Sequence, residues 1–249
     1  LTYQMRTSLA GIVFYAGTED DLLGEVNLIV GKKIYSGRLE DSEQQNPIQF
    51  EKTTQFNFPK ETVVKYWQDS EGNTITTEED VLILSEQLNI DEIQFDAVRL
   101  GNAQLTNFSD QIDSIRQLTY GSTYYFPLLH SVMHYYDDLI ENNNQTESGI
   151  YGYNSDDLTN NWYIPTVAEY YELYLANKNP VFNEIFSSFC NLEDNSFITA
   201  TQCDDHYWRM ADGPSHYYHF IINFSENIIK CDVNNNYHST IPIHTYSLN

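Results

Sequence analysis

The sequence is short of positive charge. Its 249 residues include 12 lysines and arginines against 36 aspartates and glutamates, which gives a formal net charge of -24 at pH 7. Phosphate backbones and anionic lipid surfaces repel such a chain, so we expect no nucleic-acid partner. Because the acids are scattered, the simplest interpretation is a solvated surface. Cation binding and a partner with a basic face are the alternatives.

Long apolar runs are also missing. No stretch approaches the roughly 20 apolar residues that cross a bilayer as a helix, and residues 1–11 lack the charged-then-apolar organisation of a signal peptide. These absences predict a soluble chain without membrane insertion. Hydrophobic residues still make up 41% of the sequence, which is enough for a core in one large domain or two ordinary ones.

Cysteine is scarce, and the three cysteines are Cys190, Cys203 and Cys231. None belongs to the C-x-x-C pairs that are typical of zinc and redox sites. In an oxidising compartment two of them would form a disulfide and leave one thiol over; three buried thiols are the alternative.

The sequence patterns of common enzyme classes are absent as well. There is no G-x-S-x-G segment, no phosphate-binding glycine loop and no G-x-G-x-x-G. Adjacent acidic residues occur often, but a chain this acidic contains them by chance. The sequence therefore predicts a protein that is not an enzyme and has neither catalytic residues nor a cofactor.

Residues 1–118 have the pattern of a mainly β region with short strands and turns. The predicted strands are residues 9–15, 26–30, 33–35, 49–58, 63–68 and 74–77, with the second and third arranged as a hairpin. Residues 69–73 form a turn-rich connection between the last two strands. Residues 79–100 fit either period and are assigned mainly to strand.

A change of character near Gly121 separates this region from residues 119–249. From Pro127 to Ile140, apolar residues recur at steps of three and four, which predicts a helix with one buried stripe. Further along, the predicted strands are residues 197–201, 219–224, 228–233 and 241–246.

A second helix has a more distinct start. Thr166 can cap its first turn, Glu169 three residues later can reach back to the cap, and Pro165 restricts the entry of the chain. We expect this helix to cover residues 167–176 and to end at Asn177 and Pro180.

Two helices followed by an antiparallel sheet, with a Trp-x-x-Pro-Thr-x-x-Glu segment at residues 162–169, resemble the Lcl carboxy-terminal domain family. The resemblance covers about residues 120–249. Residues 197–201 resemble its Tyr-Trp-Ser-Ser-Thr strand, and residues 218–227 resemble an aromatic strand that ends in Phe-x-x-Gly. These bacterial, largely cell-surface modules adopt a fold like that of C-type lectins and formylglycine-generating enzymes. The resemblance implies an α+β fold with a lectin-like module at residues 119–249.

The chain departs from the family pattern at several positions. Tyr163 and Ile164 replace Arg and Leu in residues 162–169, and Ile198 stands where Trp is usual. The last strand contains Pro242 and His244 where arginines are usual, which removes ion pairs. Asn227 replaces a glycine, and Asn also adopts the left-handed backbone that such a turn needs.

A polar and aromatic segment between two predicted strands, residues 204–217, is the candidate binding surface. Aromatic rings offer large rigid contact faces, and Asp, His and Arg supply directed hydrogen bonds. In a lectin-like fold, loops between the late strands commonly form the binding face. The predicted ligand-binding residues are Asp204, Asp205, His206, Tyr207, Trp208, Arg209, His216 and Tyr217. The alternative is that Tyr207 and Trp208 fold inward as core.

Metal binding has less support. Asp204, Asp205, Asp212 and Asp232 could supply the oxygens that calcium prefers, but their spacing is not that of a calcium loop. Residues His206, His216 and His219 form no spaced ligand pair, and His130 with His134 lacks a third ligand. We therefore expect no metal site.

The sequence as a whole predicts a non-catalytic, secreted or cell-surface protein of the adhesin type. Its partner would be an extracellular glycan or protein, bound through residues 119–249. The alternative is a structural subunit of a surface filament or assembly, a homo-oligomer in which exposed N-terminal strands pair between copies. A third hypothesis is a receptor-binding protein diversified by a retroelement within residues 204–217.

Overall fold

The computed structural model describes residues 10–21, 23–39, 60–83, 86–93, 127–143, 162–193, 196–203, 218–233 and 236–246. Its helices are α3 (Pro127–Met133), α4 (Tyr135–Asn143), α6 (Val167–Asn177) and α7 (Pro180–Phe186), with a 3-10 turn, η1, at Ile90–Glu92. Its strands are β1 (Gly11–Ala16), β2 (Asn27–Gly31), β3 (Tyr35–Arg38), β4 (Lys60–Gln68), β5 (Thr74–Leu82), β6 (Gln87–Asn89), β7 (Ser196–Gln202), β8 (Tyr218–Asn223), β9 (Ile228–Val233), β10 (Tyr237–Thr240) and β11 (Ile243–Tyr246). The predicted α+β class is confirmed.

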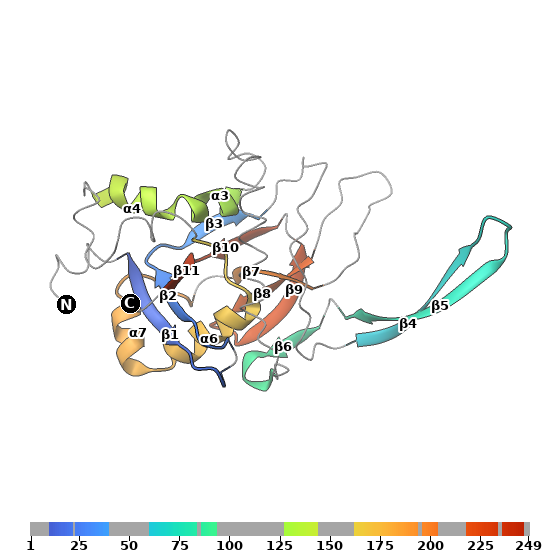
Figure 1. Ribbon diagram of the computed structural model, residues 1–249, viewed down its shortest axis with the longest axis horizontal. Helices are drawn as coiled ribbons and strands as arrows, with labels where there is room; N and C mark the ends of the chain where they lie inside the picture. Colours follow the sequence, from blue (N-terminus) through green and yellow to red (C-terminus); the bar gives the residue numbers. More distant parts are fainter. Residues whose placement is uncertain are drawn as a thin grey trace.

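The described strands form three sheets. A six-stranded sheet has the order β3-β10-β7-β8-β9-β6, a three-stranded sheet has the order β1-β2-β11, and β4 pairs with β5. Neighbours are antiparallel except β10 and β7, which are parallel. Helices α3 and α4 lie on one side of the body and α6 and α7 on the other, while the β4–β5 hairpin projects away from it (Figure 1).

The three-stranded and six-stranded sheets each combine strands from residues 1–118 with strands from residues 119–249. β2 pairs with β11, β3 with β10, and β6 with β9. The predicted boundary between residues 118 and 119 lies outside the described residues.

β2 and β3 do not form the hairpin expected for residues 26–30 and 33–35. β2 lies between β1 and β11, whereas β3 is an edge strand beside β10. Between them, the N–H of Lys32 donates to the hydroxyl of Tyr135 at 2.7 Å. The hairpin prediction is wrong because other strands occupy both edges of β2, so the chain must leave that sheet after Gly31.

The remaining N-terminal strands follow the hydrophobic pattern more closely. β1 and the β4–β5 hairpin lie where strands were predicted, and the hairpin extends further than the pattern showed. The range 79–100 contains the end of β5, then β6 and η1, and residues 94–100 are outside the described part. The predicted strand at residues 49–58 is also outside it.

The first predicted helix is present as α3 and α4. Backbone hydrogen bonds continue through the junction, because His134 N–H donates to His130 O at 3.1 Å and Asp138 N–H donates to His134 O at 3.0 Å. The apolar stripe is buried as expected, with Leu129 and Val132 fully inaccessible to solvent.

The start of α6 confirms the predicted capping box. Thr166 Oγ1 accepts from Glu169 N–H at 3.2 Å, and Glu169 Oε2 accepts from Thr166 N–H at 2.7 Å. The other oxygen of Glu169 accepts from the Tyr163 hydroxyl at 2.8 Å. The carboxyl group is buried, and this burial raises its pKa to about 7, although the hydrogen bonds that the carboxyl group accepts from Thr166 and Tyr163 act in the opposite direction.

Pro180 plays a different part from the one expected. It does not only terminate α6 but stands at the first position of α7, with Asn179 as the N-cap whose side chain accepts from Val181 N–H at 2.9 Å. Proline suits this position because the first helical N–H has no intrahelical partner. Pro180 therefore lies after the end of α6 and also at the start of a second helix, α7.

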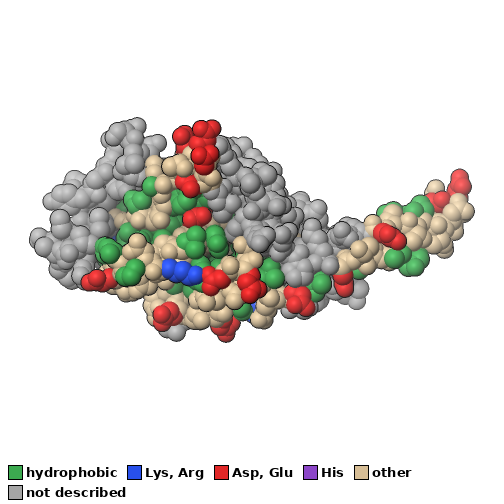
Figure 2. Space-filling model, turned by 90° about the horizontal axis from the view of Figure 1, so that it is seen from below, with side chains coloured by type: hydrophobic (Ala, Val, Ile, Leu, Met, Phe, Trp, Pro, Cys, Tyr) green, Lys and Arg blue, Asp and Glu red, His purple; other side chains and the backbone are tan. Residues whose placement is uncertain are grey.

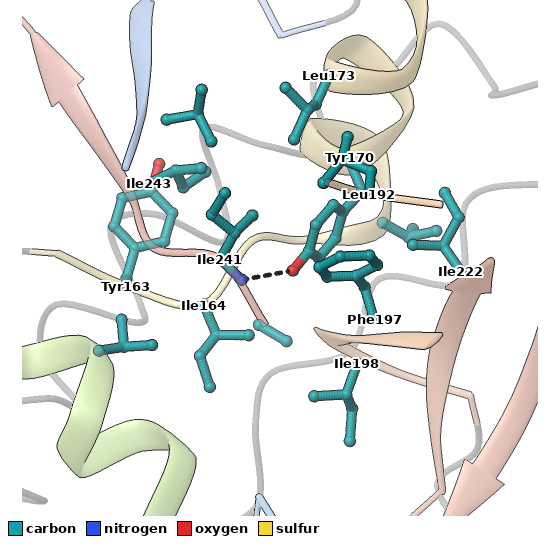
Figure 3. Close-up of a cluster of buried hydrophobic side chains, with 14 of the residues drawn as sticks. Tyr163, Ile164, Tyr170, Leu173, Leu192, Phe197, Ile198, Ile222, Ile241 and Ile243 are labelled. Atoms are coloured by element: carbon teal, nitrogen blue, oxygen red, sulfur yellow. Dashed lines mark hydrogen bonds between the residues drawn. The ribbon is translucent and has the colours of Figure 1, made fainter. Parts of the chain in front are cut away.

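The core lies where α6 faces the sheets. Tyr170 points from α6 towards Phe197 and Ile222, and its hydroxyl accepts from Ile241 N–H at 3.2 Å (Figure 3). Trp162 is fully buried, with its ring centroid 4.4 Å from that of Tyr135 and 5.2 Å from that of His244. Side chains from residues far apart in sequence thus meet around the segment that precedes α6.

In the portion of the chain that the structure describes, no helix combines the length and the apolar character needed to cross a membrane.

Thr166→Ala should lower the free energy of unfolding by about 1 kcal/mol, because it removes the acceptor for Glu169 N–H at the start of α6. Urea unfolding followed by circular dichroism measures the change. Thr166→Ser is the matched control, since it keeps the hydroxyl and should retain most of the stability. Equal stability of the alanine variant and the unsubstituted protein would contradict the capping role.

Candidate functional site

The predicted binding residues all fall within residues 204–217, which lie outside the described residues. They are Asp204, Asp205, His206, Tyr207, Trp208, Arg209, His216 and Tyr217. We call residues 204–217 the 204–217 loop. The structure does describe the residues on either side of this segment, Cys203 and Tyr218, and the strands that it connects. These define the base of the candidate site.

The two ends of the loop lie next to each other. Gln202 in β7 stands opposite His219 in β8, and Cys203 N–H donates to Tyr218 O at 2.8 Å. The chain therefore leaves β7 and enters β8 at adjacent positions of one antiparallel ladder. The loop is closed at its base by the sheet itself.

A disulfide joins Cys203, next to the loop, to β9, the strand on the far side of β8. Cys203 is bonded to Cys231 of β9, with a Cα–Cα distance of 6.1 Å, and Cys190 is free and buried. Burial raises the pKa of the Cys190 thiol to about 12, against the opposing effect of Lys32, so that thiol is neutral at pH 7. Of the two interpretations of the cysteines, the structure has one disulfide and one thiol.

β7 is irregular just before the loop. Ile198 pairs with Ile221, but the next pair is Gln202 with His219, so three residues of β7 face one residue of β8. Such a bulge leaves backbone groups that need other partners. One of them, Thr199 O, lies 2.9 Å from His219 Nδ1, which therefore carries a proton and donates to it.

The same bulge is joined to the start of α6. Ala200 N–H donates to Pro165 O at 2.8 Å, and Val167 N–H donates to Thr201 Oγ1 at 3.0 Å. The base of the loop is thus connected, by one backbone–backbone bond and one bond to the Thr201 hydroxyl, to the capping box around Glu169.

Histidine and aspartate side chains lie beneath this base. His219 stands opposite Asp232 in the β8–β9 ladder, and His238 Nε2 of β10 is 3.3 Å from Asp232 Oδ2. Burial lowers the pKa of His219 to about 4, and the charge of His238 acts in the same direction. His219 is therefore neutral at pH 7. Its role is structural, because it donates to the carbonyl group of Thr199 in the β7 bulge.

Asp232 is engaged in local structure as well. Its Oδ1 accepts from Val233 N–H at 2.8 Å and from Asn236 Nδ2 at 2.6 Å. Burial acts to raise the pKa of Asp232, but these bonds and His238 outweigh it and leave the pKa below its usual value. Of the four acids considered for calcium, Asp232 is the one within the described residues.

The structure brings the other histidine pair together on the first helix. The ring centroids of His130 and His134 are 4.3 Å apart, and His134 Nδ1 is 3.0 Å from Asp137 Oδ2. Burial lowers the pKa of His130, as does the charge of His134. Across the described ranges, no three His, Cys, Asp or Glu side chains are grouped as metal ligands.

Two features were not anticipated from the sequence. One is the association of His238 with Asp232, which depends on β10, a strand that the pattern did not predict. The other is the projecting β4–β5 hairpin, whose exposed side chains include Tyr66 and Trp67. The sequence predicted this hairpin but contained no signal that it would stand apart from the core.

Asn227, which stands where the family pattern has glycine, adopts the left-handed backbone conformation expected for this position. Its φ is 55°, in the left-handed region, at the turn between β8 and β9. Asparagine tolerates this conformation better than most residues, so the β8–β9 turn forms without glycine.

Fold and site define a disulfide-containing α+β protein in which the polar and aromatic residues 204–217 connect two neighbouring antiparallel strands, β7 and β8. Comparison with protein-family models, with curated proteins and with solved structures gave no match for this chain.

Acid should destabilise the protein through His219. The pKa of this group is about 4 in the folded state and 6.5 when the side chain is fully solvated, as in the unfolded chain, so the unfolded state binds the extra proton between these pH values. The contribution of neutral His219 to the free energy of unfolding is fully present above pH 6.5. It decreases by about 3 kcal/mol in total as the pH falls towards 4.

The measurement is urea unfolding of the unsubstituted protein and of His219→Asn between pH 7 and pH 4. Asparagine keeps a donor near the position of Nδ1 but does not titrate, so the variant should lose less stability in acid. The protonation of Glu169 changes the stability in the opposite direction to that of His219. Because Glu169 is present in both proteins, its contribution cancels when their stabilities are compared. Identical acid dependence would show that His219 is not the group responsible.

Proposed function

We propose that this protein is a non-catalytic recognition protein of the extracellular space or cell surface, which binds a glycan or protein ligand through the 204–217 loop. The observation that carries the proposal is the construction of the loop's base. The ladder between β7 and β8 closes it, and the Cys203–Cys231 disulfide fastens it to β9.

A rigid base favours binding because it reduces the conformational freedom that the loop loses when a ligand is bound. The loop sequence contains Tyr207, Trp208 and Arg209, and these three residue types dominate the energy of many interfaces. Rigid elements that position a variable loop are the usual arrangement of recognition sites.

The disulfide supports an extracellular location, since such bonds persist in oxidising compartments and are rare in the cytosol. The acidic surface supports a partner that is not a polyanion. Glycans and basic protein faces meet this condition.

The resemblance to the Lcl carboxy-terminal domain family supports the same proposal. The residues that carry it occupy structural positions here, because Trp162 is buried, Thr166 and Glu169 form the capping box, and Asn227 has a left-handed backbone. We propose on this basis that residues 119–249 are a lectin-like module, and that the ligand is bound without a metal ion.

Tyr207→Ala combined with Trp208→Ala should weaken ligand binding at least tenfold, because the change removes two large contact faces. The assay screens soluble glycans and monomeric matrix-protein fragments, and it measures each hit by calorimetry with and without calcium. The chain offers a matched control in Tyr66→Ala combined with Trp67→Ala, which removes the same two residue types from the projecting hairpin.

The control should bind like the unsubstituted protein. A binding hit that is insensitive to Tyr207 and Trp208, or a complete absence of hits among the glycans and matrix-protein fragments, would refute the proposed function. Loss of binding in calcium-free buffer would contradict the metal-free mode.

A further inference from the structure

The β4–β5 hairpin, which we call the arm, is built unlike the rest of the protein. β4 and β5 pair along their length from Lys60 opposite Leu82 to Gln68 opposite Thr74, and neither pairs with another strand of the described chain. Figure 1 shows the arm projecting from the body. An isolated two-stranded ribbon is only marginally stable in water, so an arm of this length needs a further packing partner.

The arm exposes large apolar side chains on both of its faces. The exposed fractions are 72% for Tyr66, 52% for Trp67, 44% for Val64 and 37% for Ile75. Figure 2 shows hydrophobic side chains along the arm with an acidic group at its tip. Because side chains alternate along a strand, Val63 and Trp67 share one face with Ile75, and Val64 and Tyr66 share the other.

The two edges of the arm differ in charge. β4 carries Lys60, Glu61 and Lys65, whereas β5 carries three consecutive acids at residues 78–80. Pairing β5 with β5 of another copy would gather the acids of both copies in one ladder, and like charges across a ladder are destabilising. The β4 edge has both signs of charge, so pairing with a copy of itself can place opposite charges across the ladder.

The position of the body decides how two arms can meet. If β4 paired in antiparallel fashion with β5 of a second copy, the two bodies would lie at the same end of the sheet, about 10 Å apart. The six-stranded sheet of each body alone spans about 24 Å, so the bodies would overlap. Antiparallel pairing of β4 with β4 places the bodies at opposite ends and avoids this clash.

We propose that the arm binds a second copy of this chain by antiparallel pairing of β4 with β4, about a two-fold axis at Val63. The result is an intermolecular four-stranded sheet with the order β5-β4-β4-β5. This proposal concerns β4 alone and does not depend on the function proposed for residues 204–217.

Charge complementarity sets the register. With the axis at Val63, Glu61 of each copy stands opposite Lys65 of the other, which gives two pairs of opposite charge. An axis at Glu61 or at Lys65 would oppose two like charges, and an axis at Val64 would place Lys65 opposite Val63. The Val63 register is therefore the one that pairs each of these charges with its opposite.

Charge reversal tests the register. Glu61→Lys places a lysine opposite Lys65 of the other copy, and Lys65→Glu opposes two glutamates, so each should weaken dimerisation about 10- to 30-fold. The double variant restores opposite charges and should dimerise like the unsubstituted protein. Sedimentation equilibrium at about 0.15 M salt, where exposed charges still interact over short distances, measures the dissociation constants. Glu184→Lys on α7 controls for the change in net charge.

Cross-linking tests the axis independently. Val63→Cys places two thiols directly opposite each other, within the distance that a disulfide spans, so mild oxidation should give a covalent dimer. Thr77→Cys lies on the same face of β5 and should not cross-link. Circular dichroism confirms that each variant retains the folded body.

The proposal is overturned if the unsubstituted protein remains monomeric up to several hundred micromolar, or if the single reversals dimerise normally. It is also overturned if Val63→Cys fails to cross-link while the protein dimerises, since the interface must then lie elsewhere. Loss of dimerisation in the double reversal would reject the Val63 register.

Discussion

The buried carboxyl group of Glu169 is the constraint on which the rest of the body depends. It accepts from Thr166 N–H and from the Tyr163 hydroxyl, and a buried carboxyl without these donors would be strongly destabilising. Holding these groups together shapes residues 162–169, which pair with β11 through Tyr163 and Ile243 and contact β7 through Pro165. One short segment thus joins the start of α6 to two different sheets.

This junction connects directly to the base of the 204–217 loop. The residues of β7 that bind the start of α6 form the bulge whose carbonyl group, Thr199 O, is satisfied by His219. His219 in turn lies beside the disulfide-bonded end of the loop, through its pairing with Gln202. The buried histidine is explained by backbone hydrogen bonding and needs no metal or catalytic role. A recognition loop placed here would be attached to strands that are joined by hydrogen bonds to the start of α6 and by a disulfide to β9.

The arm follows a different principle from the body. Most large apolar side chains of the body are buried against strands and helices distant in sequence, with exceptions such as Val181 and Tyr237, whereas the arm exposes Tyr66 and Trp67 next to each other. A net charge of -24 opposes non-specific association between copies. Self-association then needs local charge complementarity, and β4 offers it at Glu61 and Lys65. Joining two copies would also present two recognition loops, which raises avidity for a surface that carries many ligands.

Local signals in the sequence determined the capping box at Thr166 and Glu169, the strand at residues 228–233, the turn at residues 69–73 and the α+β class, because these depend on neighbours within a few residues. Only the tertiary structure decided that β2 and β3 enter different sheets, that Cys203 rather than Cys190 bonds to Cys231, and that the β4–β5 hairpin stands apart. These outcomes depend on which distant strands compete for each edge. The binding role of Trp208 remains a prediction, since its loop lies outside the described residues. Periodicity shows that a strand has one apolar face, but the partner that covers this face is chosen by packing across the whole chain.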